Sequence, residues 1–193
     1  MVYGCLRLIN FAHADIMMVG AFLSFFGMHS FGLPFFVSAI FAILLCGVLG
    51  VLVDKIAYVP LRNAPRISML ITAIGVSFFL ENLFNILFGS TPRFFDAPQF
   101  FSQSIDFFGL NLTVITLVVP IVALILLVIV LGILYRTKQG MAIRASAFDI
   151  SAIALMGINA NSIIALVFAI GSTLAGIGGI FYAISYPTID PLM

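Results

Sequence analysis

The sequence predicts an all-α fold, a polytopic bundle of transmembrane helices. Hydrophobic residues make up 63% of the 193 residues and charged residues only 8%, whereas an ordinary globular domain carries roughly 25% charged residues. The mean hydropathy is +1.29. The apolar residues also come in runs of about 20, the length that crosses the hydrocarbon of a bilayer. We therefore expect an integral membrane protein.

Residues 1–14 are too few and too polar for a span of their own. On a helix, Arg7, Asn10 and His13 follow one another at i, i+3 and i+6 and therefore share a face. Two interpretations stay open. The segment is either broken or cavity-lining, because polar groups at membrane depth need shelter from protein or water, or it is a helix end at the interface. In both, Asp15 is expected to cap the next helix.

Two candidate spans follow, at residues 16–31 and 34–53, with a Gly-Leu-Pro turn signal between them. The basic connector after them, residues 54–66, contains two prolines, so we expect it to be stiff and non-helical. Cys5 and Cys46 lie in apolar surroundings without the spacing of a metal site or of a disulfide framework. They are expected to be small hydrophobic residues buried in the membrane.

The span at residues 67–88 carries a polar stripe on an otherwise apolar helix. Polar and small residues recur on it at helical spacing: Thr72, Gly75, Ser77, Glu81, Asn82 and Asn85. Glu81 would lie about 21 Å from the start of this helix, well inside the bilayer. An ionisable group at that depth is costly and usually faces a cavity or a partner. We expect the stripe to border a cavity or to pack the bundle; the alternative is that Glu81 reaches the far interface.

Two more spans are expected, at residues 112–135 and 162–186. In the second, Gly171, Ala175 and Gly179 recur every four residues. Such a small-xxx-small stripe lets two helices approach backbone to backbone. About five crossings are therefore expected in all.

The longest polar run, residues 136–161, separates these last two spans. We expect a basic, strand-like exit, then a helix of about two turns that Asp149 caps and Gly157 ends, with Asn161 capping the next span. Its small residues would let another protein approach closely: Ala142, Ala145, Ser146, Ala147, Ser151, Ala152 and Ala154. The alternative is an ordinary loop with no partner.

Basic residues predict the orientation in the membrane. The connectors 54–66 and 136–161 hold six of the eight basic residues and are two spans apart, so both are expected on the cytoplasmic side. The phenylalanine-rich connector 89–111, which we expect at the membrane surface, and the C-terminus then face outward. An outward end just after a span leads us to expect a fragment of a larger protein.

Motifs of enzymes and metal sites are absent from the sequence, namely GxxxxGK[ST], HExxH, GxSxG and CxxC. Without the phosphate loop, the chain is not expected to hydrolyse ATP. We therefore expect no enzymatic activity, no catalytic residue and no metal site. The net charge of +1 gives no reason to expect a nucleic-acid partner.

Four stretches in order carry a family resemblance: LINFAHAD at 8–15, AYVPLRNAPR at 57–66, LITAIGVS at 70–77, and GMAIRA, an aspartate and GIN within 140–159. Together they resemble the permeases of branched-chain amino acid ABC transporters, and more closely the H-type of the two permease subunits. Two positions depart from the usual pattern, Ala14 in place of glycine and Val59 in place of arginine. The first slightly stiffens a hinge-like position.

The resemblance implies an all-helical permease subunit of the bacterial inner membrane, surrounded by lipid. It implies four partners: a second permease subunit, two cytosolic ATP-binding subunits and a periplasmic solute-binding protein. The substrate would be leucine, isoleucine or valine, and the chain would need no cofactor because its partners use the ATP. A coupling helix is implied within 136–161, and we expect the ATPase contact at Arg144, Ala145, Ala147, Asp149 and Gly157. We expect the translocation path to be bordered by Asn10, His13, Thr72, Glu81 and Asn82.

Three alternatives to this function stay open. Permeases for urea or short-chain amides share much of the same pattern. An ion-coupled secondary carrier would need a relay of acids inside the membrane, and Glu81 is the only clear candidate. A non-transporting assembly subunit would stabilise its partners and tolerate changes in the polar stripe.

Overall fold

The computed structural model describes residues 11–62, 64–107, 110–148, 153 and 157–193. The long helices of this part are α2 (Ala12–His29), α3 (Phe35–Val53), α4 (Arg66–Phe88), α6 (Val114–Arg136) and α9 (Ala160–Ser185). The short elements are α5 (Gln99–Ser102), α7 (Lys138–Ser146), β1 (Arg93–Phe94), β2 (Ser104–Phe107), β3 (Leu110–Thr113) and β4 (Thr188–Ile189). Four helical stretches are long and apolar enough to cross a membrane: Phe35–Leu61, Ile67–Phe88, Val114–Arg136 and Ala160–Ser185. The predicted all-α, multi-pass fold is confirmed.

The expected span at residues 16–31 forms as helix α2, but it is not among those four. Its 18 residues include the polar side chains of His13 and Asp15 near its start. Because α2 begins at Ala12, Asp15 is not the cap that we expected: it lies in the first turn, with only 6% of its surface exposed.

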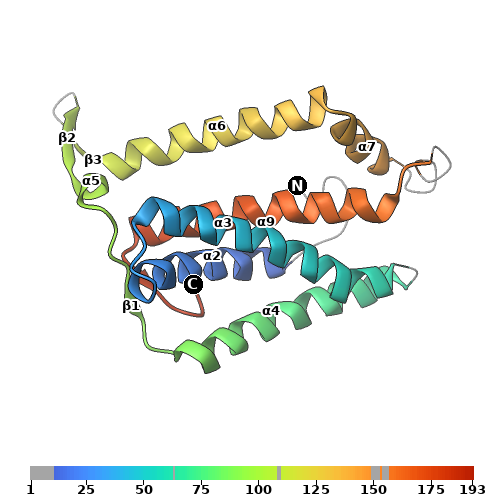
Figure 1. Cartoon of the computed structure of the whole chain (residues 1–193), viewed down its shortest axis with the longest axis horizontal. Coiled ribbons are helices and arrows are strands. Elements are labelled where there is room, and N and C mark those ends of the chain that lie inside the picture. The colour runs from blue at the N-terminus through green and yellow to red at the C-terminus, as the bar shows by residue number, and fades with distance from the viewer. Residues whose placement is uncertain (1–10, 63, 108–109, 149–152, 154–156) are drawn as a thin grey trace.

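Helices α2, α3 and α9 pack against one another in the middle of the molecule, with α4 along one side and α6 along the other (Figure 1). Small residues make these crossings close. A Cβ atom added at Gly176 of α9 would lie 2.9 Å from Cys46 of α3, and one added at Gly20 of α2 would lie 2.6 Å from the Cα atom of Gly176. The predicted small-residue stripe is confirmed, since α9 buries Gly171, Ala175 and Gly179.

The expectation of a non-helical connector at residues 54–66 is wrong for most of its length. Helix α3 continues through a π-helical turn, Asp54–Tyr58, into a 3₁₀ turn, Val59–Leu61. Pro60 is tolerated because it stands in the first turn of the 3₁₀ segment, where a missing N–H group removes no helical hydrogen bond. The free thiol of Cys46 is buried as expected, and Cys5 lies outside the described residues.

Short strands lie at the end of the bundle away from α7 (Figure 1). Aromatic rings also pack there. Strand β1 pairs with β4, and β2 with β3, both antiparallel. Arg93 donates to the carbonyl oxygen of Phe88 at 2.8 Å, and its guanidinium lies 5.7 Å from the ring of Phe26. In the connector, Phe95 and Phe101 are buried against the bundle. These two rings therefore pack on the protein itself rather than at the membrane surface.

Candidate functional site

The chain turns sharply between α6 and α7, and the corner is held rigidly. Thr137 accepts a hydrogen bond from the N–H of Gly140 at 2.9 Å and donates one to the carbonyl oxygen of Ile133 at 2.6 Å. A Cβ atom on Gly140 would come within 2.6 Å of the Cα atom of Leu134. The corner thus combines a side-chain cap with a close backbone approach that only glycine allows.

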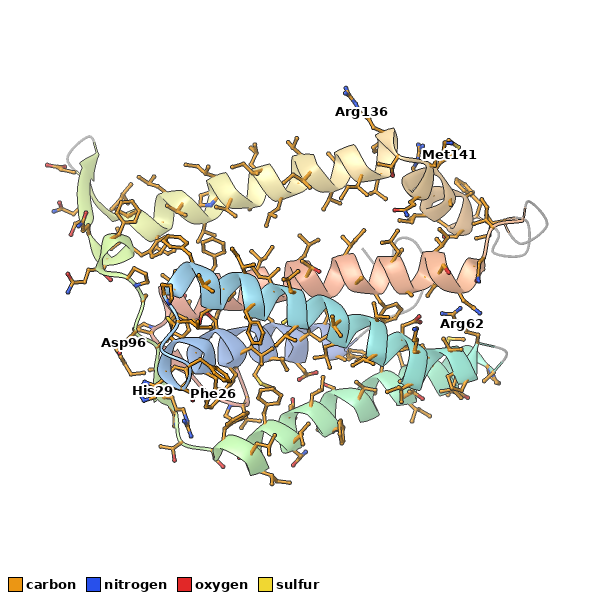
Figure 2. The ribbon with its side chains drawn as sticks, in the orientation of Figure 1. Phe26, His29, Arg62, Asp96, Arg136 and Met141 are labelled. Atoms are coloured by element: carbon orange, nitrogen blue, oxygen red, sulfur yellow. The ribbon has the colours of Figure 1, made fainter. Side chains whose placement is uncertain are left out.

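Helix α7 corrects the expected strand-like exit, because its residues Lys138–Ser146 are helical. One face is buried against the bundle by Ala142, Ile143 and Ser146. On the other face, Met141 is 61% exposed and points outward in Figure 2, and Phe148 just beyond the helix is 90% exposed. The small residues Ala142 and Ser146 therefore face inward, which contradicts the expectation that they are open to another protein.

Residues predicted for the ATPase contact are distributed around this corner. Arg144 is exposed and its guanidinium lies 4.7 Å from the centre of the Tyr135 ring. Ala145 and Ala147 are half-buried. Gly157 is exposed, and its φ of 77° confirms the predicted left-handed turn. Asp149 lies outside the described residues.

Helix α9 begins with a different cap from the predicted one. Asn159, not Asn161, accepts hydrogen bonds from the backbone N–H groups of Asn161 at 3.0 Å and of Ser162 at 3.4 Å. The cap thus comes one residue before the helix, the usual position for such a side chain. The side chain of Asn161 is left available for another contact.

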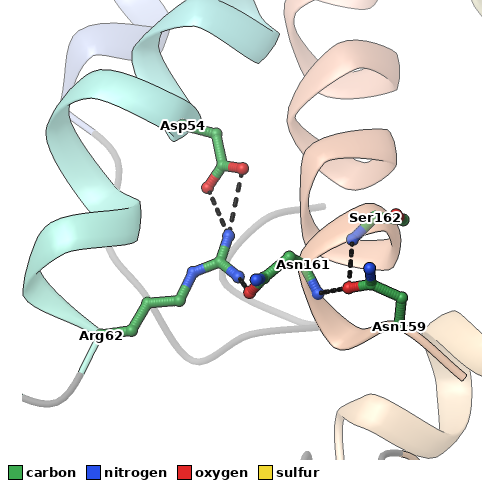
Figure 3. A network of polar contacts seen from close by, with 5 residues as sticks. All are labelled: Asp54, Arg62, Asn159, Asn161 and Ser162. Carbon is green, nitrogen blue, oxygen red and sulfur yellow. Dashed lines mark hydrogen bonds and ion pairs between the residues drawn. The ribbon is translucent and has the colours of Figure 1, made fainter.

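That contact is part of a polar network around Arg62 (Figure 3). The Nη2 atom of Arg62 donates to both carboxylate oxygens of Asp54, at 2.9 and 3.1 Å, and Nη1 donates to the amide oxygen of Asn161. The Asp54 side chain is 1% exposed and that of Arg62 is 18% exposed. Since a buried carboxylate is costly unless paired, this ion pair fixes Arg62 to the end of the α3 segment. The sequence interpretation counted Asp54 and Arg62 only as charges of the connector 54–66, and Asn161 only as a cap.

The described residues predicted for the translocation path lie on two helices, α2 and α4. Thr72 donates to the carbonyl oxygen of Ser68 at 2.9 Å, and Asn82 donates to that of Phe78 at 2.7 Å. These two donors are thus satisfied within their own helix, α4. Glu81 is half-buried on the same helix, whereas His13 is exposed on α2. Asn10 lies outside the described residues, and the path stays a prediction.

One polar contact between helices escaped the sequence interpretation. Ser77 of α4 donates a hydrogen bond of 2.5 Å to the buried carboxylate of Asp15 on α2. Ser77 belongs to the predicted polar stripe, so the stripe does face the bundle at this position. The signal that could have revealed the pair is that a polar stripe on a membrane helix needs a polar partner, and Asp15 is an acid at the start of another span.

A second feature lies between α6 and α9, where an open apolar cavity of about 350 Å³ is lined by residues such as Val119, Leu126, Leu174 and Phe181. Its lining is almost entirely apolar, so it offers few polar groups that could bind or activate a polar substrate. Across the described ranges, no group of three or more His, Cys, Asp or Glu side chains could hold a metal ion.

Comparison with known proteins identifies the family. A family model described as "Branched-chain amino acid transport system / permease component" matches residues 1–193. The high-affinity branched-chain amino acid transport system permease proteins LivH of Salmonella typhimurium and Escherichia coli K12, and BraD of Pseudomonas aeruginosa, are each 32% identical to this chain. Each comparison covers 99% of the chain and 66% of the relative, so the chain spans slightly less than two thirds of their length. No solved structure matches. The chain belongs to the family of branched-chain amino acid transport system permease components.

Proposed function

We propose that the chain is a permease subunit of an ATP-binding cassette importer for leucine, isoleucine and valine in the bacterial inner membrane. It works with a second permease subunit, two cytosolic ATP-binding subunits and a periplasmic solute-binding protein. The ATP is used by the partners, and the chain itself carries no cofactor. The family and the names of its relatives support the substrate class, and helix α7 supports the mechanism.

The outward side of α7 is the observation on which the mechanism depends. It presents Met141 and Phe148 to the surroundings, with Arg136, Lys138 and Arg144 exposed beside them. Apolar side chains surrounded by basic ones fit a partner groove that has an apolar floor and an acidic rim. The inward side is fastened by Ile143, which is completely buried. A push on α7 would therefore move the helices beneath it.

In this mechanism, closure of the ATP-binding subunits displaces α7 and biases the bundle between two orientations of its cavity. The energy of nucleotide binding acts through the difference in contacts that the partner makes with the two states. Residues Arg144, Ala145, Ala147, Asp149 and Gly157 stay proposed members of this contact. Met141 and Phe148 join them because both are apolar side chains largely exposed at the corner.

Cysteine cross-linking from the two faces of α7 tests this contact. In the assembled complex, Phe148→Cys should form an adduct with the ATP-binding subunit, and its yield should change with nucleotide. Ala142→Cys is the matched control, since Ala142 is 5% exposed and faces the bundle, and it should give none. Equal yields from both positions, or no adduct from Phe148→Cys, Met141→Cys or Ala147→Cys, would overturn the proposed contact.

Uptake by the reconstituted complex tests the substrate and the energy source. Leucine should accumulate with ATP and continue after collapse of the proton gradient. Excess isoleucine should compete with leucine, and excess urea should not. Competition by urea in place of isoleucine would support the amide-permease alternative, and dependence on the proton gradient would support a secondary carrier.

The translocation path is proposed along α2 and α4, with Asn10, His13, Thr72, Glu81 and Asn82 as its border. A hydrophobic amino acid needs only modest polarity there if the solute-binding protein provides the high-affinity recognition. Alanine in place of Asn82 should lower leucine uptake, because this side chain is exposed in the chain by itself. Unchanged uptake by both Asn82→Ala and Asn10→Ala would contradict the path.

A further inference from the structure

We propose that Arg62 is a positioning residue that transmits displacement of α7 to the end of α3 through its bond to Asn161. The inference rests on the proposed function. The guanidinium of Arg62 holds Asp54 with one terminal nitrogen and Asn161 with the other. Arg62 and Asn161 are 99 positions apart in the sequence. Asn161 lies in the first turn of α9 (Figure 3), a helix that α7 contacts.

The geometry of this link requires arginine. A guanidinium has two terminal nitrogens in a rigid plane, so it can bind two acceptors in different directions at once. Lysine would place one compact charge near Asp54 and would leave Asn161 without a donor at the same distance. The residue therefore does more than neutralise a buried carboxylate: it joins two helices.

The two bonds of Arg62 differ in strength. Its bond to Asp54 is a charge-assisted pair in a buried place, and such pairs are the stronger kind. Its bond to Asn161 has a neutral acceptor and lies at the surface. Arg62 therefore remains bound to Asp54 at the end of α3. The bond to Asn161 can be removed without breaking the bond to Asp54.

The cap of α9 does not depend on this bond. The side-chain oxygen of Asn159 accepts hydrogen bonds from the backbone N–H groups of Asn161 and Ser162. The substitution Asn161→Ala removes the acceptor for Arg62 and leaves both backbone donors paired. It is therefore a selective change, whereas Asn159→Ala removes the cap and leaves the link in place.

The link lies at the rim of an apolar cluster that already connects the same elements. Ile143 of α7, Ile164 of α9 and Val53 of α3 belong to this cluster. Tyr58, in the π-helical turn, packs against Phe168 of α9 with 5.0 Å between ring centres. Apolar contacts of this kind can slide, but a directional hydrogen bond sets the register between the two helix ends. A shift at the start of α9 is thus passed to α3 as a defined displacement.

The test is the amount of leucine transported per ATP hydrolysed, measured on the full-length permease assembled with its partners in proteoliposomes. With Asn161→Ala, this ratio should fall about threefold to tenfold, the factor that corresponds to one net hydrogen bond, while ATP hydrolysis continues. Asn161→Asp restores an acceptor for Arg62 and should keep the wild-type ratio. Asn159→Ala should lower thermal stability and leave the ratio unchanged.

Two results would overturn the inference: an unchanged ratio in Asn161→Ala, or an equal loss of the ratio in Asn159→Ala. Failure of the proposed function would look different, since the wild-type complex would then show no ATP-dependent uptake. Adding Asn161→Ala to Arg62→Lys supplies a second measurement. The ratio should fall no further than in Arg62→Lys alone, and an additive loss would contradict the link.

Discussion

The three central helices and the two flanking helices differ in packing far more than in apolar character. In their most apolar stretches, 56% of the residues of α9 and 28% of those of the helix Phe35–Leu61, which contains α3, are buried, against 17% for α4 and 6% for α6. Yet α6 consists almost entirely of large aliphatic residues. Apolar residues therefore identify a membrane helix, but they do not say whether its neighbour is protein or lipid.

Small residues make that distinction. Where α2, α3 and α9 cross, added Cβ atoms at Gly20, Gly176 and Gly179 would collide with neighbouring helices. On the flanking helices, a Cβ atom at Gly75 or at Gly132 would meet nothing within 4 Å. In a bilayer, where helix association depends on close packing and polar contacts, the spacing of small residues predicts the centre of the bundle better than hydropathy does.

The largest expected effect is the loss of the ion pair at the end of α3. Arg62→Ala leaves the Asp54 carboxylate buried without its counter-charge, so the free energy of unfolding should fall by about 3–5 kcal/mol. Equilibrium unfolding of the purified chain in mixed detergent micelles measures it. Arg93→Ala is the comparison at the other end of the bundle, where the partners are a carbonyl group and rings, and it should cost less. An equal cost would contradict the importance given to the buried carboxylate.

Replacing glycine by alanine should lower the free energy of unfolding in a central helix and raise it in a flanking helix. Gly179→Ala would drive a methyl group into the backbone of Met17, a collision that should cost about 1–3 kcal/mol of unfolding free energy. Gly132→Ala on α6 should instead stabilise by up to about 1 kcal/mol, because alanine is the better helix former. Both are measured on the isolated chain in detergent. Destabilisation of equal size at both positions would remove the distinction between the two groups of helices.

Helix α4 is attached to the centre partly by the bond between Ser77 and Asp15. Ser77→Ala leaves a buried carboxylate without its hydroxyl donor and should lower the unfolding free energy by about 1–3 kcal/mol. Ser90→Ala removes an exposed hydroxyl that bonds Asn85 and should change it by less than about 0.5 kcal/mol. The same unfolding assay compares the two. A neutral Ser77→Ala would mean that α4 is held by its apolar contacts alone.

The smallest expected effect is at the cap between α6 and α7. Thr137→Ala removes the acceptor for the N–H of Gly140 and should cost about 1 kcal/mol, whereas Thr137→Ser should keep the cap. Hydrogen exchange at the amides of α7 is the suitable measurement, because the loss is local. Equal protection of Gly140 and Met141 in both variants would show that close packing, not the cap, holds the corner.

Sequence reasoning predicted the site only where the information is local. The polar run between the last two spans and the left-handed Gly157 follow from the residues themselves, and the structure confirms both. Helix α7 was missed, because a strand-like exit was expected where Thr137, also a good cap, begins a helix. The helix expected between Asp149 and Gly157 falls mainly on residues outside the described ones and stays a prediction. Asn159 was overlooked for a similar reason: two asparagines stand within three residues, and composition does not tell which one caps.

The sequence by itself determined that this is a multi-pass helical membrane protein, because crossing the hydrocarbon is a property of each run of about 20 residues. The permease family followed separately, from the resemblance of four motifs. Only the tertiary structure decided which polar side chains pair across the helices. Asp15 and Ser77 are 62 positions apart, and Arg62 and Asn161 are 99 positions apart. It also decided that α7 turns its small residues inward and Met141 outward. Such choices depend on which helices become neighbours, and no local pattern contains that information.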